Sequence, residues 1–577
     1  MRTVSLLAVT LGWLLLPTAA GATACGDPAS PIARIQGSGP SSPKTGQQVT
    51  VEGIITLDTR YPGGFNGFFV QQADADTDHN PATSEALFVY TRNTAGKAGD
   101  RVRITGTATE FHGLTQLHRV TRITACGPGV LPAPLTIPWP PGRGAEAVEG
   151  MLVTIQHPMV VVEHHNLLRY GELTLAADDQ RVPTQWLLPG PESFALEHRQ
   201  TQQRLLLDDG YSRRFPPTIS YLPAPLGPRR TLRTGTLTHG LTGIIDYRFG
   251  HWRLQPVTAP RFETTNPRRP APARGADVTL RVTAMNLQNY FNGDGRGGGF
   301  PTPRGARTPD EADTQRRRLA AALRATNSDI ITVTELENDG PDEFSALAAL
   351  ARELGPDWRY VQDNNPGEDA IRGAILYRHG RTRPVGPAAY PTRSEYPHPA
   401  RPPLAQSFSL ADGGSVRVVV THFKSKNCRG ARGRERDQRD GQSCFAHRRT
   451  QSARALARWL EELPAATGSR GTLLTGDLNS YAREAPLKVL ARAGYTDLVR
   501  HFSGLDNHSF RYRGRRGTLD YSLASQELLP YVSHSEIWAI NADEPAALGY
   551  RHGGQHQTAP SPWRSSDHDP VITDLTF

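Results

Sequence analysis

The residues best suited to chemistry lie near the end of the chain, in Ser565-Ser566-Asp567-His568-Asp569-Pro570. A carboxylate can hold a divalent cation, and the imidazole beside it can move a proton near neutral pH. Asp569-Pro570 and the apolar run 571–575 predict a turn and then a final buried strand. Asp567 and His568 would then lie at the entrance to a strand. A lone Ser-Asp-His tripeptide does not establish a site, so its partners must come from elsewhere in the chain.

Polar residues of the same chemical kind follow several earlier strands. Short apolar strands are predicted at 278–285, 329–334, 416–421 and 472–475. The polar residues at the ends of these four strands are Asn286, Glu335, His422, and Asp477 with Asn479. Asp520 stands at a fifth such position, and Asp567 with His568 at a sixth. A packed core does not need them, and buried carboxylates without partners are costly, so the set implies a cation or a proton relay. The alternative is a series of independent turn caps, which the ordered recurrence at six strand ends disfavours.

The elements that position these residues form an α/β domain. Between residues 276 and 577 the strands alternate with amphipathic helices at 311–326 and 450–463, as in an α/β sandwich. Upstream, five short strands within 25–128 favour a small all-β, OB-like barrel. A Pro-rich passage opens a second β-rich region at 129–266, and a stiff, basic linker is expected at 267–275.

Aromatic residues of the predicted barrel allow two interpretations. OB-folds often bind single strands by stacking bases on aromatic rings over a basic groove. In a small barrel, alternating aromatic residues also form the core. The side chains concerned are Phe65, Phe68, Phe69, Phe88 and Phe111.

An acidic loop in the same domain has the oxygen spacing of a calcium site. Its side chains are Asp74, Asp76, Asp78, Asn80 and Glu85. It lacks the glycine that follows the third acid in such loops, and it has no flanking helical pattern. A solvated acidic loop is therefore the alternative to a Ca²⁺ site.

The N-terminal residues predict export. Arg2 precedes an apolar run from Val4 to Leu16, and Ala22-Thr23-Ala24 is a small-x-small cleavage site, so residues 1–24 are expected to be a signal peptide. No later segment is apolar enough to span a membrane. Cleavage would leave Cys25 first, which resembles a lipoprotein acceptor, although Ala22 stands where such sites have leucine. A secreted protein is predicted, with surface attachment or a periplasmic location as alternatives.

The four cysteines, Cys25, Cys126, Cys428 and Cys444, predict two disulfides in an exported chain. The sequence leaves the connectivity open. The pairs Cys25–Cys126 and Cys428–Cys444 would each fall within one predicted domain. Their wide, unequal spacing argues against a zinc site.

The ordered polar set resembles the endonuclease/exonuclease/phosphatase superfamily, the DNase I-like fold, and more closely the secreted bacterial extracellular nucleases of the ExeM/NucH type. The segments that carry the resemblance are Glu335-Leu-Glu337-Asn338-Asp339-Gly340, Asp369-Ala-Ile-Arg372, His422-Phe-Lys424-Ser-Lys426 and Asp440-Gly-Gln-Ser-Cys444. Proteins of this type also carry an OB-like region and a second β-rich segment. The resemblance therefore implies a C-terminal four-layer α/β sandwich over residues 276–577, preceded by two β-rich domains.

The resemblance also implies a mechanism. Glu335, Asp567 and Asn286 would hold Mg²⁺ or Mn²⁺, and Glu335 is preferred over Glu337 because it lies nearer the end of the apolar strand and matches the superfamily position. His568 would activate the attacking water with Asp520 orienting it. His422 would stabilise the phosphate and protonate the leaving oxygen. Asp477 and Asn479 would orient the reactants, with Asp477 as the alternative base.

Charge indicates the substrate. The formal net charge is +9, and five arginines lie between Cys428 and Cys444. Lys424, Lys426 and Arg372 are further candidates for phosphate contacts. The leading prediction is an extracellular, metal-dependent endonuclease of low sequence specificity, monomeric, acting on DNA and possibly RNA. The alternatives are a sphingomyelinase or inositol-phosphate phosphatase of the same superfamily, and a non-catalytic binding or adhesion protein.

Overall fold

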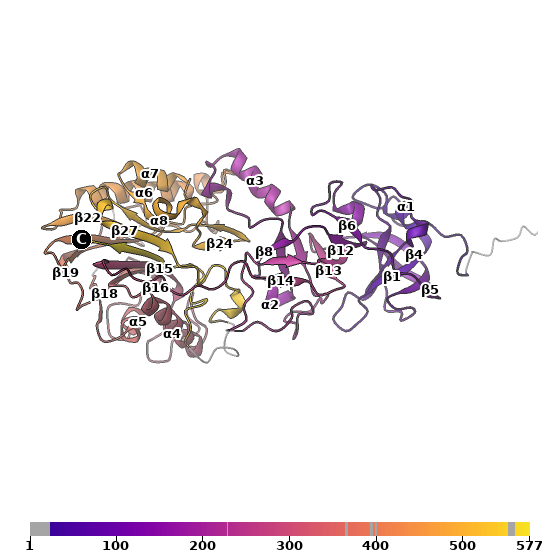
Figure 1. Cartoon of the computed structure of the whole chain (residues 1–577), viewed down its shortest axis with the longest axis horizontal. Coiled ribbons are helices and arrows are strands. Elements are labelled where there is room, and N and C mark those ends of the chain that lie inside the picture. The colour runs from indigo at the N-terminus through magenta and orange to yellow at the C-terminus, as the bar shows by residue number, and fades with distance from the viewer. Residues whose placement is uncertain (1–23, 228, 364–366, 393–395, 398–400, 552–559) are drawn as a thin grey trace, which may run out of the picture. The chain divides into compact units, whose positions relative to one another are not determined.

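The structure, a computed structural model, describes residues 24–227, 229–363, 367–392, 396–397, 401–551 and 560–577 (Figure 1). The predicted signal peptide lies outside these residues except for Ala24. The chain forms two compact units. The first comprises the residues up to Leu135 with Gly142–Val153 and Ile244–Gly250, and the second comprises Thr136–Pro141, Thr154–Gly243 and His251–Phe577. Within the described part, no helix has the length and apolar character that a bilayer crossing requires.

The first unit is built on a closed five-stranded barrel in the order β1-β2-β3-β5-β4. Its elements are α1 (Ile32–Gln36), β1 (Gln48–Asp58), β2 (Gly67–Gln71), β3 (Ala86–Tyr90), β4 (Asp100–Phe111) and β5 (Leu114–Pro128). All pairs that close the barrel are antiparallel except β3 with β5. Of the five phenylalanines, all but Phe111 are buried, so most of the predicted stacking surface is barrel core.

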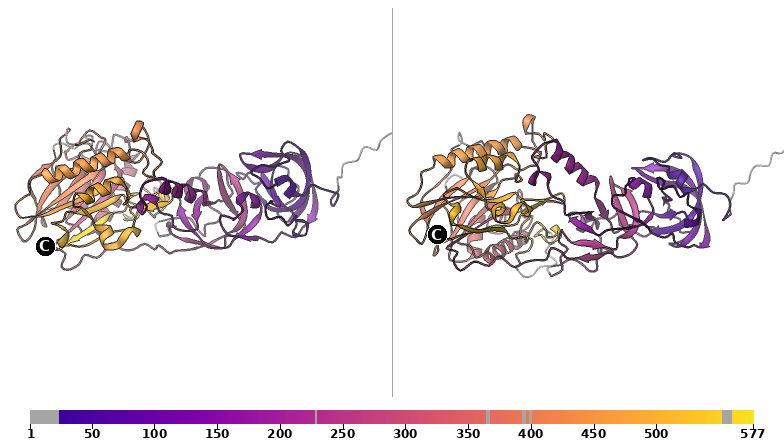
Figure 2. Two further views of the ribbon diagram at one scale, coloured as in Figure 1. Left: turned by 90° about the horizontal axis from the view of Figure 1, so that it is seen from above. Right: turned by 45° about the horizontal axis from the view of Figure 1, so that its top comes forward.

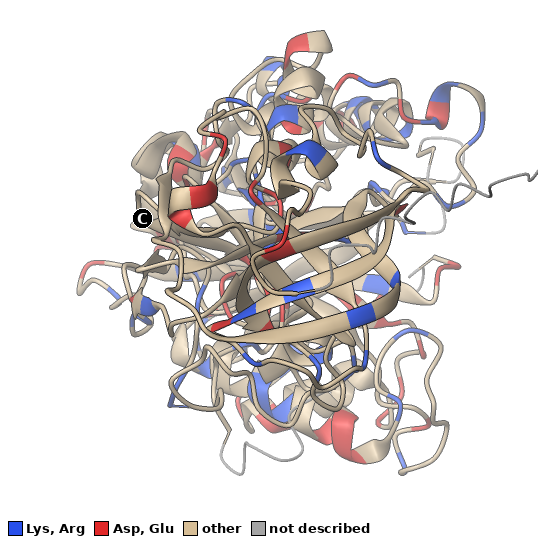
Figure 3. Ribbon diagram, turned by 90° about the vertical axis from the view of Figure 1, so that its right-hand side faces the viewer, with Lys and Arg blue, Asp and Glu red and all other residues tan. Residues whose placement is uncertain are grey.

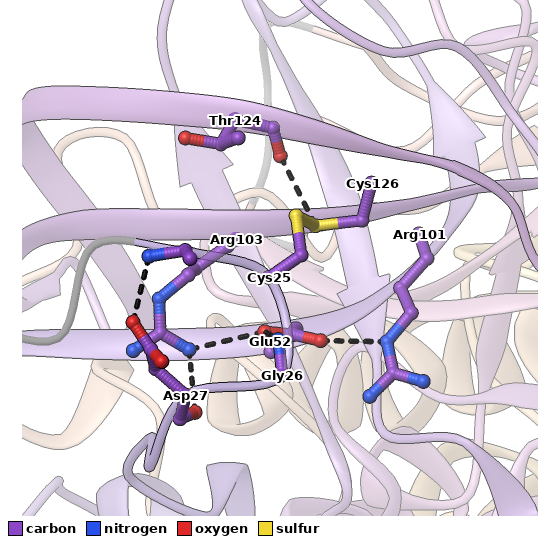
Figure 4. The surroundings of a disulfide bond; sticks show 9 residues. Cys25, Gly26, Asp27, Glu52, Arg101, Arg103, Thr124 and Cys126 are labelled. Carbon is purple, nitrogen blue, oxygen red and sulfur yellow. Dashed lines mark hydrogen bonds and ion pairs between the residues drawn. A yellow bond between two sulfur atoms is a disulfide. The ribbon is translucent and has the colours of Figure 1, made fainter.

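One disulfide closes the N-terminal end of this barrel, joining Cys25 to Cys126 (Figure 4). Beside it, the Glu52 carboxylate accepts hydrogen bonds from the Arg101 and Arg103 side chains at 2.7 and 3.0 Å. A sulfur in a disulfide cannot also carry a thioether lipid, so this pairing and a lipid anchor at Cys25 exclude each other.

The acidic loop is used for local hydrogen bonding. Asp78 accepts from the backbone N–H of Asn80 at 2.8 Å, and Glu85 accepts from that of Asp78 at 2.8 Å. Asp74 accepts from the N–H of Ala133 at 3.1 Å. Among the described residues, the groups of ligand atoms close enough to hold a metal do not include this loop. The geometry therefore supports the solvated loop rather than the calcium site.

The second unit begins with a segment of mixed structure at residues 154–243, here called the middle segment. Part of a nine-stranded sheet runs here in the order β14-β11-β8-β9-β10-β13, in which β13 and β14 follow the middle segment in the chain. The elements are β8 (Met159–Glu163), α2 (Leu167–Tyr170), β9 (Leu173–Ala176), α3 (Pro191–Gln202), β10 (Leu205–Leu207), β11 (Leu237–His239), β13 (His251–Pro256) and β14 (Arg261–Glu263). Strands β6 (Leu135–Ile137), β7 (Leu152–Ile155) and β12 (Thr242–Arg248) have residues in both units.

Two six-stranded sheets form the centre of the C-terminal part. The first has the order β17-β18-β16-β15-β28-β27, and the second β19-β20-β21-β22-β26-β23. First-sheet strands are β15 (Leu280–Tyr290), β16 (Ile330–Glu337), β17 (Trp358–Tyr360), β18 (Ile371–Arg378), β27 (Val532–Ile537) and β28 (Val571–Leu575). Second-sheet strands are β19 (Pro384–Ala389), β20 (Leu404–Ser409), β21 (Ser415–His422), β22 (Ser469–Asp477), β23 (Thr496–Asp497) and β26 (Asp520–Ala524).

Helices cover the outer face of each sheet and complete four layers (Figures 1 and 2). Helices α4 (Pro309–Ala325) and α5 (Ala346–Leu354) pack on the first sheet through leucines and alanines, and α6 (Ala446–Glu462) and α7 (Ala485–Arg492) on the second. A third core of aliphatic side chains lies between the sheets. α8 (Leu498–Ser503) and the hairpin β24 (Phe510–Tyr512) and β25 (Arg515–Gly517) complete the unit. The expected α/β sandwich is therefore confirmed.

Sequence signals explain where the helices begin. The Thr308 side chain accepts from the N–H of Glu311, and Pro309 occupies the first turn of α4. Ser345 caps α5 in the same way. The predicted linker before the sandwich is held at several points. Arg268 pairs with Glu544 at 2.7 Å, the Arg269 carbonyl accepts from the Trp538 indole N–H at 3.0 Å, and Arg274 pairs with Asp329 at 2.7 Å.

Candidate functional site

Strand pairing brings the predicted polar residues to one edge of the sandwich. β15 and β16 are parallel, so Asn286 and Glu335 emerge at the same end. In the second sheet, His422 lies opposite Asp477, and Asp477 lies opposite Asp520. Asp567 and His568 precede β28, which is antiparallel to β15 and therefore starts at this edge.

His568 is held by a buried carboxylate. Its Nδ1 lies 2.7 Å from Oδ2 of Asp520, which also accepts a 2.7 Å hydrogen bond from the Ser509 hydroxyl. The Phe510 ring stacks on the imidazole with 4.4 Å between ring centroids. The hydrogen bond and the stacked ring together fix the plane of the imidazole.

Glu335 occupies an unusual backbone position. Its φ of 58° lies in the left-handed region, where a bulge interrupts β16 between Val333 and Leu336. One carboxylate oxygen accepts hydrogen bonds from the backbone and side-chain N–H groups of Asn289, at 3.0 and 2.8 Å. Such local strain is typical of functional sites. The rival residue Glu337 instead accepts from the backbone N–H of Asn292 at 2.8 Å.

His422 and Asp477 form the centre of the second sheet's contribution. His422 Nε2 lies 3.6 Å from Oδ2 of Asp477 and 4.0 Å from Oε1 of Glu335. Asp477 accepts from the backbone N–H of Asn479 at 2.8 Å and from its side-chain amide at 3.1 Å. Nη1 of Arg401 lies 2.9 Å from Nδ1 and 3.1 Å from Nε2 of His422, which places a cation against the imidazole.

The electrostatics of the site follow from buried, neighbouring carboxylates. Burial and the charge of Asp520 raise the pKa of Asp477 to about 7. Burial and the charge of Asp567 raise the pKa of Glu335. Although burial disfavours the imidazolium, the neighbouring carboxylates, chiefly Asp520, raise the pKa of His568 well above its usual value. The site concentrates negative charge that a cation would relieve.

The donor set suits a hard divalent cation. Ligand atoms of Glu335, His422 and Asp477 lie within 4.8 Å of one another, as do those of Asp477, Asp520 and His568. Carboxylate and amide oxygens are the donors that Mg²⁺ and Mn²⁺ prefer. The Asn286 amide lies beside this cluster: its nitrogen donates to Asp477 at 3.1 Å, and its oxygen accepts from the N–H of Gln288 at 2.9 Å. The residues present therefore fit a metal held mainly by Glu335, with Asp567 contributing charge.

Two of the three predicted substrate cations are held in buried ion pairs. Lys426 donates to both oxygens of Glu484 at 2.7 Å, and Arg372 pairs with Asp363. Both positive charges are therefore neutralised by carboxylates of the protein itself. Lys424 is half-buried, with its ammonium 4.9 Å from the centre of the Phe445 ring.

A group of exposed arginines lies in the loop closed by the Cys428–Cys444 disulfide. Its exposed arginines are Arg429, Arg432, Arg434, Arg436 and Arg439. Figure 3 shows Lys and Arg interspersed with Asp and Glu in the view it gives, so the net charge alone does not define a binding face.

Sequence reasoning missed several residues that complete the site. Asn289, Arg401, Ser509 and Phe510 contact Glu335, His422, Asp520 and His568 respectively. Asn289 could have been found, because it closely follows Asn286 in a strand with polar positions. No local pattern marks Arg401, Ser509 or Phe510, which reach the site only through the fold.

Comparisons with known proteins find family matches in two parts of the chain. Residues 286–568 match the Endonuclease/Exonuclease/phosphatase family, and residues 145–267 match a domain of unknown function. No curated protein matches the sequence.

Similar solved structures cover about half of the chain. Humanized TDP2 from D. rerio is 13% identical, with a TM-score of 0.35, over 52% of this chain and 99% of that one. An endonuclease/exonuclease/phosphatase from Beutenbergia cavernae is 16% identical, with a TM-score of 0.34, over 52% of this chain and 71% of that one. The human Nocturnin catalytic domain is 16% identical, with a TM-score of 0.32, over 52% and 93%.

Proposed function

We propose that this protein is an exported, metal-dependent endonuclease that hydrolyses DNA with little sequence preference. The match of residues 286–568 to the endonuclease/exonuclease/phosphatase family supports this proposal. The observation that carries the proposal is the Asp520–His568 pair, which lies at the same edge as the cluster of Glu335, His422 and Asp477. A proton-moving pair beside a cation-binding cluster is the equipment that phosphodiester hydrolysis requires.

Two histidines carry out the two proton transfers of the proposed reaction. His568 takes a proton from the attacking water through Nε2, while Asp520 holds Nδ1. His422, with the Arg401 guanidinium against its ring, stabilises the phosphate and protonates the leaving oxygen. Asp477, kept in place by Asn479, orients the water, or serves as the base in its stead. Mg²⁺ or Mn²⁺, held by Glu335 with Asp567 and Asn286, would neutralise phosphate charge and oppose the negative field that raises the pKa of His568.

The disulfide-closed loop supports a polyanionic substrate. Its five exposed arginines offer contacts to phosphates without reading base edges. Helix α3 holds the loop, because the Asp440 carbonyl accepts from the N–H of Gly190 at 2.8 Å and from the Ser193 hydroxyl at 2.9 Å. The barrel order of the first unit agrees with an OB-like domain, and the two disulfides with an oxidising, extracellular location.

The test is a plasmid assay with purified mature protein. We expect Mg²⁺-dependent nicking that EDTA abolishes, and His568→Ala should slow it by about 10²–10⁴-fold with the fold intact. RNA serves as the second substrate and sphingomyelin as the non-nucleic control. Hydrolysis of sphingomyelin with plasmid left intact would replace the proposal by the phosphatase-type alternative.

A further inference from the structure

The hairpin β24–β25 carries residues that define the position of His568. Phe510 stacks on the imidazole, and the preceding Ser509 donates to Asp520, the carboxylate that holds Nδ1. The Ser509 carbonyl also accepts from the N–H of Asp569, next to His568. This hairpin is a separate two-stranded sheet. A two-stranded hairpin is marginally stable by itself in water, so other residues must fix it.

The middle segment binds the opposite face of the hairpin through hydrogen bonds and ion pairs. Neighbouring strand residues point to opposite faces, so Phe510 faces His568 while Arg511 faces away from it. Arg511 donates two hydrogen bonds to Asp179, at 2.7 and 3.0 Å. Asp179 also pairs with Arg516 of β25 at 2.9 Å. A single carboxylate of the middle segment thus ties both strands of the hairpin.

Backbone hydrogen bonds also join the middle segment to β25. The N–H of Arg516 donates to the Gln180 carbonyl at 3.0 Å, and the N–H of Val182 donates to the Arg516 carbonyl at 3.0 Å. Arg181 and Arg516 form a parallel β-bridge. Residues 180–182 therefore act as a third strand beside the hairpin.

Two glutamine side chains of the middle segment form further hydrogen bonds to β25 and to the residues between β25 and Asp520. The Gln185 side-chain oxygen accepts from the N–H of Thr518 at 3.1 Å, two residues before Asp520. On α3, Gln200 accepts from the Arg515 guanidinium at 2.8 Å. Each of these bonds joins positions more than 300 residues apart in the chain.

A buried carboxylate secures the start of the hairpin. Asp543 accepts from Arg511 at 2.5 Å and from His508 at 3.0 Å. It also accepts from the Thr234 hydroxyl of the middle segment at 2.7 Å. His508 and Arg511, which flank Ser509 and Phe510, are thus anchored by the same carboxylate.

We infer that the middle segment is part of the catalytic apparatus, with Asp179 as a positioning residue that holds β24–β25 and, through Ser509, Phe510 and Asp520, orients His568. The inference rests on the proposed function and assigns a role to the region that matches a domain of unknown function. An ordinary domain contact would contribute only stability. A positioning contact controls the geometry of the imidazole, and a displacement of about 1 Å can cost about 10²-fold in rate.

The test uses Asp179→Asn in the full chain, with Asp412→Asn as its matched control. Asp412 also pairs with an arginine, Arg470 at 2.7 Å, and has a similar exposure, 32% against 28% for Asp179. The first readout is the Nδ1–H proton signal of His568 in the resting protein, assigned by its loss in His568→Gln. The second is kcat and KM on DNA. Asp179→Glu tests rescue by a conserved charge.

We expect Asp179→Asn to shift or broaden the His568 signal and to lower kcat about 10- to 100-fold with KM within about twofold. Asp412→Asn should leave both unchanged, and Asp179→Glu should recover part of kcat. An unaltered His568 signal and kcat in Asp179→Asn would overturn the inference. If the wild-type protein does not cleave DNA, the proposed function fails, and the His568 signal alone still decides the positioning role. If Asp179→Asn does not fold, Gln185→Ala takes its place with the same outcomes.

Discussion

The side-chain amide of Asn286 donates a 3.1 Å hydrogen bond to Asp477, and this bond joins the two central sheets at the edge where the candidate site lies. Asn286 belongs to β15 of the first sheet and Asp477 to β22 of the second. The site therefore contains residues from both sheets, and its geometry depends on how the two sheets pack against each other.

We predict that Asn286→Ala lowers both stability and activity. It leaves the buried Asp477 without one donor, which should reduce the free energy of unfolding by about 1–3 kcal/mol. The matched control is Thr332→Val, because Thr332 and Thr475 join the same two sheets through a 2.8 Å hydrogen bond away from the site. Urea unfolding and plasmid cleavage check both variants. An equal loss of activity in the two would show that Asn286 matters only for packing.

Glu335→Gln should abolish metal-dependent activity, whereas Glu337→Gln should retain it. Glu335 lies close to His422 and Asp477, while the Glu337 carboxylate accepts a hydrogen bond from the backbone N–H of Asn292. Calorimetric titration with Mn²⁺ measures the metal affinity of each variant directly. We expect weaker binding in Glu335→Gln only. Weaker binding in Glu337→Gln alone would reverse the assignment of the two glutamates.

Neutralising an exposed arginine of the disulfide-closed loop should reduce the salt dependence of DNA binding. Each phosphate contact contributes about 0.9 to the slope of log K against log salt concentration on duplex DNA. Arg432→Ala is therefore expected to lower this slope by about 0.9. Arg454→Ala, on the exposed face of α6, is the control and should leave it unchanged. Identical slopes for Arg432→Ala and the wild type would remove Arg432 from the DNA contact.

The sequence was sufficient to predict the ordered polar set because each member lies beside a short apolar strand. Turn residues closely flank the short strands β2 and β3, which helped to predict five short strands in this part of the chain. Glu335 was expected just after its strand and instead lies within β16, at a bulge. A bulge preserves the apolar pattern on both sides, so periodicity did not locate it.

Contacts between distant parts of the chain were beyond sequence reasoning. Lys426 closely follows His422, which suggested a phosphate contact, but its ammonium is buried against Glu484. Helix α3 was not predicted, because few of its side chains are buried and it has no clear apolar stripe. The middle segment consequently showed no chemical feature until its contact with β24–β25 was visible.

The junction between the middle segment and the sandwich should weaken in acid through His164. Burial lowers the pKa of His164 to about 4, and the nearby charges of Arg564 and Arg511 act in the same direction. Its ring Nε2 lies 3.1 Å from the Asp543 carbonyl oxygen. The unfolded chain binds the proton with a pKa near 6.5, so it takes up the proton before the folded protein does.

The sign follows from this order of protonation. Stability is unaffected by His164 above about pH 6.5 and falls as the pH drops towards 4, by about 2 kcal/mol between pH 7 and pH 5. Urea unfolding at these two pH values measures the loss, and His164→Gln, which keeps an N–H donor but does not titrate, should be less sensitive to acid by the same amount. Because other groups titrate equally in both proteins, the difference between them isolates His164. An acid sensitivity equal to that of the wild type would show that His164 does not remain neutral in the folded state.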